Sequence, residues 1–255
     1  MRLDALLAKE GVFPSRTKAS QAIVEGKVLF DGKSAKPSLE LENLSKITVL
    51  DKKDAFVSNG GYKLQKAFDD FTYSPSGLTF ADIGASNGGF TDCLLKNGAV
   101  KVYAVDVGET QLENSLLSDK RVVVVDNTNA RFLTESVLGE RVDGVSVDVS
   151  FISVTYILDG IKSVLKQNGV AFILIKPQFE CGKEYLGNSG IVKSASARIS
   201  AIKKVYGACK NVGLFATDIT VAPVRDNKNV EYLLMLKNDD ISAHLSIDEI
   251  INKIR

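Results

Sequence analysis

The N-terminal part of the chain carries the spacing of two short helices followed by a small sheet. In RLDALLAKEG the apolar side chains Leu3, Leu6 and Leu7 recur at helical intervals. In SRTKASQAIVEG, Ser15 is a candidate N-cap and Gly26 a candidate stop after the second helix. The stretch KVLFDGKSAKPS then indicates a strand, an Asp-Gly turn and a strand, and KITVL indicates a further strand.

The rest of the chain has a different pattern, in which predicted strands and helices alternate. GYKLQKAFDDF has the spacing of a helix with one apolar face. Five strands are then expected in LTFADIG, VKVYAVDVG, RVVVVDN, VDGVSVDVS and GVAFILIKP, with helices in FTDCLLKNG, ISVTYILDGIKSVLKQNG and residues 195–211. LFATDITVAPV and NVEYLLMLK complete the pattern. The alternation predicts an α/β fold, a mostly parallel sheet with helices on both faces, whose ligands bind outside the carboxyl ends of the strands.

Between the two patterns lies LDKKDAFVSNGGYKL, where Lys-Lys-Asp and Asn-Gly-Gly are typical of a boundary. We therefore expect a small domain over residues 1–55, a linker over 56–62 and a large domain over 63–255. A chain of 255 residues has the length for a large domain plus a small one.

Composition says more about the cellular compartment of the protein than about its function. The chain is 45% hydrophobic and 25% charged, as in ordinary globular proteins, and its net charge of +1 neither requires nor excludes a nucleic-acid partner. Cys93, Cys181 and Cys209 show neither metal spacing nor a disulfide framework, which favours a reducing cytoplasm and predicts no metal site. No signal peptide is visible and the apolar runs are too short to span a bilayer, so we expect no membrane insertion.

The single histidine, His244, excludes much chemistry. A Ser-His-Asp or Cys-His mechanism, or a site with several histidine ligands, would have to rely on it. His244 lies in a polar stretch near the C-terminus, and we expect it to be a solvated surface residue.

The motif ADIGASNGGFT follows the first strand of the large domain and opens a helix. Gly84, Gly88 and Gly89 allow a ligand to approach the backbone, but their spacing differs from the dinucleotide motif, which argues against a nicotinamide-dependent oxidoreductase. A tight turn alone would explain one glycine loop. Aspartates, however, end each of the first four strands: Asp82, Asp106, Asp126 and Asp148. Any one would suit a surface carboxylate or a cap, whereas four in register favour a binding site.

Lys176 ends the fifth strand in LIKPQFE, although lysine is costly to bury. Taken alone, a strand-end lysine whose amine reaches solvent is the simpler interpretation. Asp148 and Glu231 also lie at or near strand ends, and Lys63 heads the helix before the first strand. With these three residues beside it, a functional role for Lys176 is favoured.

The N-terminal segment, RLDALLAKEG followed by SRTKASQAIVEGKVLFDGK, resembles the alpha-L RNA-binding module, or S4 domain, of a ribosomal protein and several RNA-modifying enzymes. Its cations lie mostly off the apolar faces, and composition alone fits a solvated surface equally well. The resemblance implies that the second helix lies against RNA, with cations on phosphates. The candidate RNA contacts are Arg2, Lys9, Arg16, Lys18 and Lys27, with Arg131 added from the large domain.

The glycine loop and acidic strand ends look like the Rossmann-like fold of class I methyltransferases, a mostly parallel seven-stranded sheet that binds S-adenosylmethionine. In this likeness Gly84 to Gly89 pass the methionine part, Asp106 holds the ribose, and Asp126 with Asn127 lies beside the adenine. Asp82 supports the loop or the amino group. The implied donor contacts are Asp82, Gly84, Ala85, Ser86, Gly88, Gly89, Phe90, Asp106, Val107, Asp126, Asn127 and Asp148.

The whole chain resembles the TlyA (hemolysin A) family of rRNA 2′-O-methyltransferases, related to the bacterial heat-shock rRNA methyltransferase. FVSNGGYKL, ADIGASNGGFTDCLL, DVSFIS, LIKPQFE, GIV and NVEYLL each match a family block. The resemblance implies a catalytic Lys63, Asp148, Lys176 and Glu231, with Lys176 acting on the ribose hydroxyl either as a neutral base or as a cationic donor. It further implies a cytidine in a ribosomal subunit as substrate, and the large subunit because the chain starts directly at the RNA-binding module.

Two alternatives and two departures accompany this resemblance. A non-catalytic ribosome-binding or assembly protein could retain the same fold, and the historical family name suggests a membrane-active hemolysin, against which the lack of a spanning segment argues. Asn59 stands where the family linker usually has arginine, so a cationic RNA contact is missing there. VDNTNAR carries Asp126 and Asn127 where a longer acid–arginine pair is common, which weakens the assignment of the adenine contacts.

Overall fold

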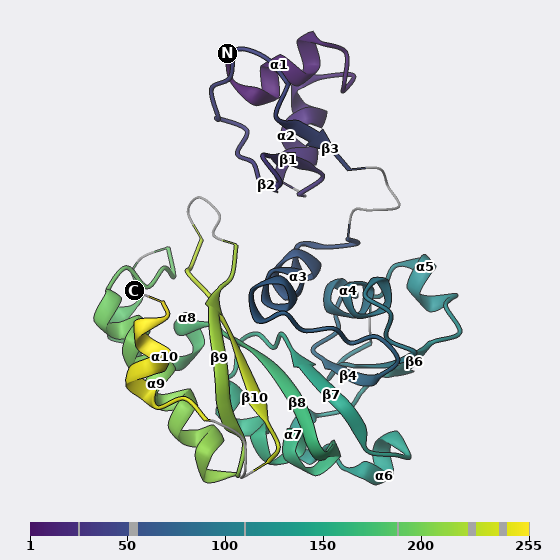
Figure 1. Cartoon of the computed structure of the whole chain (residues 1–255), viewed down its shortest axis with the longest axis vertical. Helices are drawn as coiled ribbons and strands as arrows, with labels where there is room; N and C mark the ends of the chain where they lie inside the picture. Colours follow the sequence, from purple (N-terminus) through teal and green to yellow (C-terminus); the bar gives the residue numbers. More distant parts are fainter. Residues whose placement is uncertain are drawn as a thin grey trace.

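The protein is described here by a computed structural model covering residues 1–24, 26–50, 56–109, 111–187, 189–223, 228–239 and 244–254. A small N-terminal unit lies above a larger unit built around an open sheet in Figure 1. The expected boundary at residue 55 lies outside the described residues. Helix α3 runs over Asn59–Phe71, so it already includes the last residues of the segment expected as a linker. The exact domain limits stay a prediction.

The small unit contains two helices and a three-stranded sheet in its described residues, as the sequence predicts. Helices α1 (Leu3–Lys9) and α2 (Arg16–Val24) precede strands β1 (Val28–Phe30), β2 (Lys33–Ser34) and β3 (Ile47–Val49). The strands pair antiparallel in the order β2-β1-β3. Ser15 caps α2, since its Oγ accepts a hydrogen bond from the Lys18 amide at 3.2 Å.

Seven strands form the sheet of the large unit in the described part of the chain, in the order β6-β5-β4-β7-β8-β10-β9. They span Thr79–Ile83 (β4), Lys101–Val105 (β5), Val122–Val125 (β6), Val142–Val147 (β7), Leu165–Ile175 (β8), Phe215–Val221 (β9) and Tyr232–Lys237 (β10). Neighbours from β6 to β8 pair parallel, and β10 is antiparallel to β8 and β9. The prediction of a mostly parallel sheet is confirmed.

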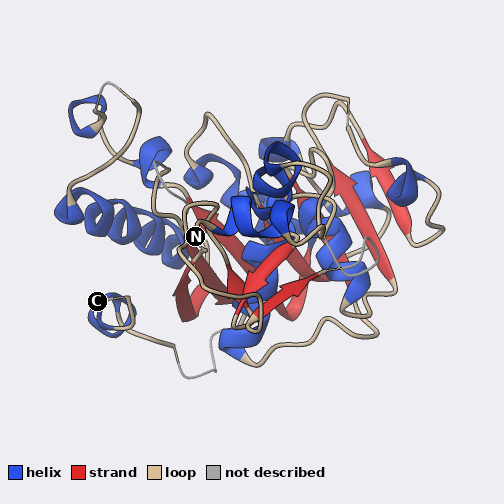
Figure 2. Cartoon of the chain, turned by 90° about the horizontal axis from the view of Figure 1, so that it is seen from above, coloured by secondary structure: helices blue, strands red, loops and turns tan. Residues whose placement is uncertain are grey.

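Alternate side chains of each strand enter two separate cores, because successive residues of a strand point to opposite faces. Phe80 and Phe172 pack with α3 and α4 (Gly89–Lys96) on one face. Their neighbours Ala81 and Ile173 pack on the other face, against α7 (Leu158–Val164), α9 (Ala195–Asn211) and α10 (Ile247–Asn252). Figure 2 shows helices on both sides of the twisted sheet.

Several short elements of the structure were not predicted from the sequence pattern. They are α5 (Asn114–Leu117), α6 (Glu135–Leu138), α8 (Pro177–Glu180) and the 3₁₀ turns η1 (Ala130–Phe132), η2 (Val154–Ile157) and η3 (Lys183–Tyr185). The helix expected over ISVTYILDGIKSVLKQNG is wrong in its last turn, since α7 ends at Val164. Leu165 is already extended and pairs with Val142 of β7, so sheet pairing replaces the last helical turn.

The carboxyl ends of β4, β5, β7 and β8 meet at one edge of the sheet. The chain order reverses between β4 and β7, because β5 and β6 lie on one side and β8 on the other. Ligands of open α/β sheets bind at such a switch point. The segments that leave these strand ends, around Gly84, Asp106, Asp148 and Lys176, are therefore brought together by the topology alone.

His244 lies at the opposite edge, which corrects the expectation of a solvated residue. Its ring stacks on Phe215 with 4.2 Å between centroids, and its Nε2 lies 3.3 Å from Asp239 Oδ1. Phe215 pairs with Lys237 at one end of the β9–β10 ladder. Tyr232, which follows Glu231, pairs at the other end, so His244 lies far from Glu231 along the ladder. The His244 side chain is 22% exposed because the start of β9 packs against it.

Candidate active site

A glycine loop joins β4 to α4 and shapes the centre of the edge. Gly84 has φ +83°, and a Cβ placed there would lie 2.7 Å from the carbonyl oxygen of Asp148. Gly88 has φ +87°, and its Cβ would meet Leu116 Cδ1 at 2.2 Å. Both positions therefore need glycine for conformation and for space. The Gly84 amide donates to Val105 O at 2.8 Å, which ties the loop to β5.

A cleft of about 590 Å³ opens beside this loop, between the ends of β4, β5 and β7. Asp106 lines it, and its carboxylate accepts hydrogen bonds from the amides of Ser86 at 3.0 Å and Gly108 at 3.2 Å. Two carboxylate oxygens have about four lone-pair sites, so Asp106 keeps acceptor capacity for a ligand such as a ribose diol. The arrangement fits a nucleoside ligand with its sugar at the end of β5.

The other expected donor contacts divide into groups. Ala85, Ser86, Gly89 and Phe90 line a second cleft, of about 150 Å³, which also reaches Asp148 and Lys176. Val107 is 70% exposed and lines the large cleft. Past the end of β6, the lining of that cleft comes from Thr128 and Asn129, which follow the expected Asp126 and Asn127 in the chain. The roles assigned to these residues stay predictions.

Asp82 is placed below the loop, not in its opening. Its side chain is fully buried and accepts hydrogen bonds from Thr91 Oγ1 at 2.7 Å and Ser146 Oγ at 2.9 Å. Thr91 belongs to α4 and Ser146 to β7, so the carboxyl group joins the glycine-loop helix to the neighbouring strand. Of the two roles expected for Asp82, this geometry fits support of the loop.

Lys176 is buried at the end of β8, and its amine does not reach out to solvent. The side chain is 11% exposed, and Nζ lies 2.6 Å from Asp148 Oδ1. Nζ also donates a hydrogen bond to Ser150 Oγ at 2.7 Å. Lys176 also lines the small cleft, so a ligand bound there would lie beside its side chain.

A second ion pair completes the set of four. Lys63 Nζ lies 2.6 Å from Glu231 Oε2, with side chains 22% and 16% exposed. Tyr232 pairs with Ile175 in the β8–β10 ladder, so the residues before and after them, Glu231 and Lys176, emerge side by side. The structure therefore brings together four charged groups from α3 and from the ends of β7, β8 and β10.

A third cleft, of about 550 Å³, lies over the Lys63–Glu231 pair. Asn59 and Gln178 line it, and their side-chain oxygens Oδ1 and Oε1 are buried and accept no hydrogen bond within the described residues. Gln178 Nε2 makes a long contact of 3.4 Å to Glu231 Oε1. Burying an acceptor without a protein partner is costly, so the wall of this cleft holds two polar groups whose hydrogen bonds the described residues do not satisfy.

Two family sequence patterns cover most of the chain. The FtsJ-like methyltransferase pattern matches residues 56–238 and the S4 domain pattern matches residues 1–42. The 16S/23S rRNA (cytidine-2′-O)-methyltransferase TlyA of Mycobacterium tuberculosis is 39% identical over 239 residues, which is 92% of this chain and 89% of that protein. This chain belongs to the TlyA family of FtsJ-like methyltransferases.

Solved structures agree with the TlyA assignment. A candidate hemolysin from Streptococcus thermophilus is 34% identical with a TM-score of 0.73, and the match covers 99% of this chain and 94% of that one. A candidate hemolysin from Lactococcus lactis is 40% identical with a TM-score of 0.72, covering 78% and 97%. The predicted resemblance to the TlyA family is confirmed over nearly the whole chain.

The cations expected to contact RNA are arranged in two places on this TlyA-family chain. Arg2 and Arg16 both pair with the buried Asp4, at 3.0 Å and 3.2 Å, which holds two guanidinium groups together on the small unit. Lys9 and Lys18 are exposed and Lys27 is half-buried. In the large unit, the exposed Arg131 lies over the Tyr156 ring, 4.7 Å from its centroid. Their contacts with RNA stay predictions.

Sequence reasoning missed several residues that the structure places at this TlyA-type site. Ser150 contacts Lys176, and Phe151 is 89% exposed with φ +66° on the same loop. Phe151 lines both large clefts, and its ring lies 5.4 Å from that of Phe179. Their position just after Asp148 was the available signal, because residues that follow a site strand end share its edge.

Proposed function

We propose that this chain transfers a methyl group from S-adenosylmethionine to the 2′-hydroxyl of a cytidine ribose in ribosomal RNA. One observation carries the proposal. The ion pairs Lys176–Asp148 and Lys63–Glu231 stand side by side next to the glycine-loop clefts. Within a methyltransferase family, this is where a donor methyl and an acceptor hydroxyl have to meet.

The residues present fit the donor. The loop from Gly84 to Gly89 offers a backbone surface that side chains would fill, and Asp106 has acceptor capacity for a ribose diol. Asp148 adds negative charge near a sulfonium group. When bound, the donor would supply a methyl group on positively charged sulfur, with the neutral thioether as the leaving group.

The chain's own residues would orient that nucleophile. Lys176 pairs with Asp148, donates to Ser150 and lines the small cleft, so its ammonium is placed to contact a ribose oxygen there. Lys63, fixed by Glu231, suits a second contact with the sugar. In the transfer the oxygen forms a bond to the methyl carbon, the carbon–sulfur bond breaks, and the hydroxyl proton leaves to a base or to water. Holding the two reactants in line is worth about 7–11 kcal/mol.

Features around the site suit an RNA substrate. An exposed aromatic ring such as Phe151 offers a stacking surface for an unpaired base. The amide side chains of Asn59 and Gln178 line the cleft over the Lys63–Glu231 pair, which suits a ligand with polar groups such as a nucleotide. The S4 domain adds cations for phosphates. An enzyme acting on ribosomal RNA would work where ribosomes are, in the cytoplasm.

The alternatives have less support. A non-catalytic ribosome-binding protein has no need for two neighbouring lysine–carboxylate pairs beside a donor cleft, and burying such charges is costly. For a membrane-active protein, no helix within the described residues is long and apolar enough to cross a bilayer. The methyltransferase proposal accounts for both the pairs and the clefts.

The test is methyl transfer from labelled donor to ribosomal subunits from a strain that lacks this gene, with each subunit assayed separately. We expect label as a ribose methyl, and a loss of at least about 100-fold in kcat for Lys176→Ala, with donor binding nearly unchanged. Lys166→Ala is the matched control, since Lys166 lies on the same strand and pairs with Asp143 at 2.7 Å. Full activity in Lys176→Ala would overturn the assignment.

A further inference from the structure

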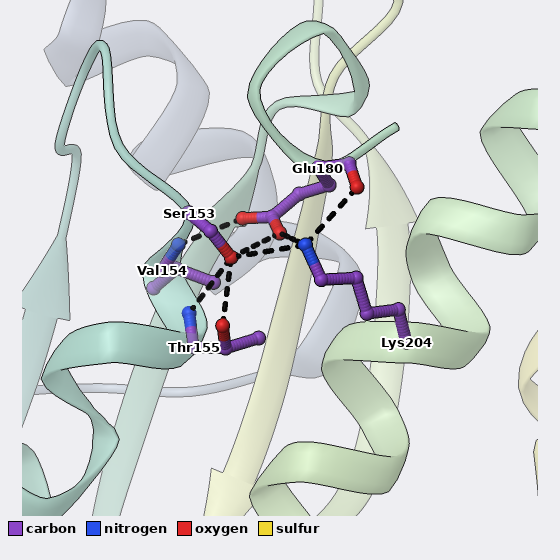
Figure 3. A network of polar contacts seen from close by, with 5 residues as sticks. All are labelled: Ser153, Val154, Thr155, Glu180 and Lys204. Carbon is purple, nitrogen blue, oxygen red and sulfur yellow. Dashed lines mark hydrogen bonds and ion pairs between the residues drawn. The ribbon is translucent and has the colours of Figure 1, made fainter. Parts of the chain in front are cut away.

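Glu180 is a buried carboxylate that the site described above does not use. It is the last residue of α8, four positions after Lys176, and its side chain is 2% exposed. A buried carboxylate is costly unless it is paired and hydrogen-bonded, so its contacts require an explanation. In Figure 3 the Glu180 carboxylate lies between the Ser153–Val154 turn and the amine of Lys204.

The Glu180 carboxylate contacts residues of other elements. Ser153 Oγ donates to Oε2 at 2.5 Å, and the Val154 amide donates to Oε1 at 2.7 Å. Lys204 of α9 donates to Oε2 at 3.0 Å and to the Glu180 carbonyl oxygen at 3.1 Å (Figure 3). Ser153 is itself held by Thr155 Oγ1 at 2.8 Å. One carboxylate thus fastens the end of the β7–η2 loop to α8 and α9.

The loop between β7 and η2 contributes the two residues that contact the Lys176 amine. It begins at Asp148 and includes Ser150, and both contact Lys176 Nζ, at 2.6 Å and 2.7 Å. Lys176 in turn is the residue directly before α8. The two segments therefore touch twice, once at the amine and once at Glu180. The second contact limits how far Asp148 and Ser150 can move from the lysine.

We propose that Glu180 is a positioning residue for methyl transfer, setting the placement of the loop that carries Asp148, Ser150 and Phe151 relative to Lys176. This inference rests on the proposed function. Glu180 touches no reacting group and acts through the Ser153–Val154 turn. Lys204, 46% exposed on α9, balances its charge. A misplacement of about 1 Å at a reacting centre can cost on the order of 100-fold in rate.

Two variants at position 180 separate tethering from charge. Glu180→Ala removes the tether, whereas Glu180→Gln keeps an oxygen for the Val154 amide and an amide group facing Ser153. We expect kcat to fall on the order of 10- to 100-fold in Glu180→Ala and only a few-fold in Glu180→Gln. Donor Kd and subunit Kd should stay within about twofold, because the glycine loop, Asp106 and the small unit, to which those ligands are assigned, lie outside the tethered loop.

Ser153→Ala tests the same tether from the loop side and serves if Glu180→Ala does not fold. Its kcat should fall about tenfold, with unchanged donor Kd. The control is Asp143→Asn at the other end of β7, because Asp143 likewise accepts one backbone amide, Thr79 N at 2.9 Å, and one lysine, Lys166. Its kcat should equal that of the unaltered protein even if its thermal stability falls.

The outcomes keep this inference distinct from the proposed function. If the unaltered protein transfers methyl groups and both Glu180→Ala and Ser153→Ala keep kcat within about twofold, Glu180 is a structural anchor only and the inference fails. A loss in kcat matched by Asp143→Asn, or explained by weaker donor binding, also overturns it. If the unaltered protein transfers no methyl group to either subunit, the proposed function fails first.

Discussion

Asp82 shows how burial alone changes the chemistry of a carboxyl group beside the site. Burial raises its pKa from 3.8 to about 6, against hydrogen bonds from Thr91 and Ser146 that lower the pKa, and the charge of Asp148 raises it further. The folded protein therefore binds this proton more tightly than the unfolded chain. The resulting stability is fully present below pH about 4 and is lost as pH rises through about 6.

Asp82→Asn should remove this pH dependence while keeping both hydroxyl partners, because the hydroxyls can either donate or accept. Relative to the unaltered protein, the variant should gain about 1 kcal/mol of unfolding free energy when the pH is raised from 5 to 8. Denaturant unfolding at the two pH values measures this difference. Equal pH dependence in both proteins would show that the carboxyl group ionises normally in the fold.

At the scale of single residues, the sequence indicated those side chains whose position follows from strand ends. Asp106, Asp148 and Lys176 were found this way, because parallel strands end at a common edge. Ser150 and Glu180 were not, since their partners lie 26 and 27 residues away in the chain. Contacts of that kind depend on the exact register of two loops, which residue spacing does not encode.

At the scale of elements, short apolar runs predicted the strands well, because each strand is buried on both faces and contributes to two separate cores. It failed where sheet pairing competes with helix formation, at the end of α7, and where a helix has a single turn, as in α8. Such a turn has too few residues to show a period. α8 nonetheless places Gln178 and Glu180, so the least predictable element positions part of the site.

The glycine loop provides a prediction at this scale. In Gly84→Ala the new Cβ would meet the Asp148 carbonyl oxygen at 2.7 Å in a backbone with φ +83°, so the loop and the β7 end must separate. Overpacking costs about 1–3 kcal/mol, so donor Kd should rise on the order of tenfold or more. Calorimetric titration with S-adenosylmethionine measures it.

Gly77→Ala is the control for this substitution. Gly77 has φ +76°, and a Cβ there would meet nothing within 4 Å, so it carries the backbone strain without the clash. It precedes β4, at the end of the strand away from the cleft. Its donor Kd should be unchanged. Weakened donor binding in both variants would attribute the effect to general strain and not to the close approach at Gly84.

At the scale of the whole molecule, the chain combines a methyltransferase sheet with a separate small unit that carries paired guanidinium groups (Figure 1). The two-part organisation followed from the change in hydrophobic period, which needs no long-range contact. The placement of the pairs did not, because Asp4 joins Arg16 from a different helix. Recognition of a large RNA by such a chain should therefore separate into affinity on one unit and chemistry on the other.

This separation is testable by reversing charge on the small unit. In Arg16→Glu with Lys18→Glu, both exposed on α2, subunit binding should weaken, and the slope of log K against log salt should decrease by about two. The kcat at a saturating concentration of subunit should change little, since the Lys176–Asp148 and Lys63–Glu231 pairs are not altered. Reversal of Lys203 and Lys210, exposed on α9, alters the net charge equally and should leave both quantities near their original values. Equal losses in the two double variants would mean that net charge, and not the α2 surface, holds the RNA.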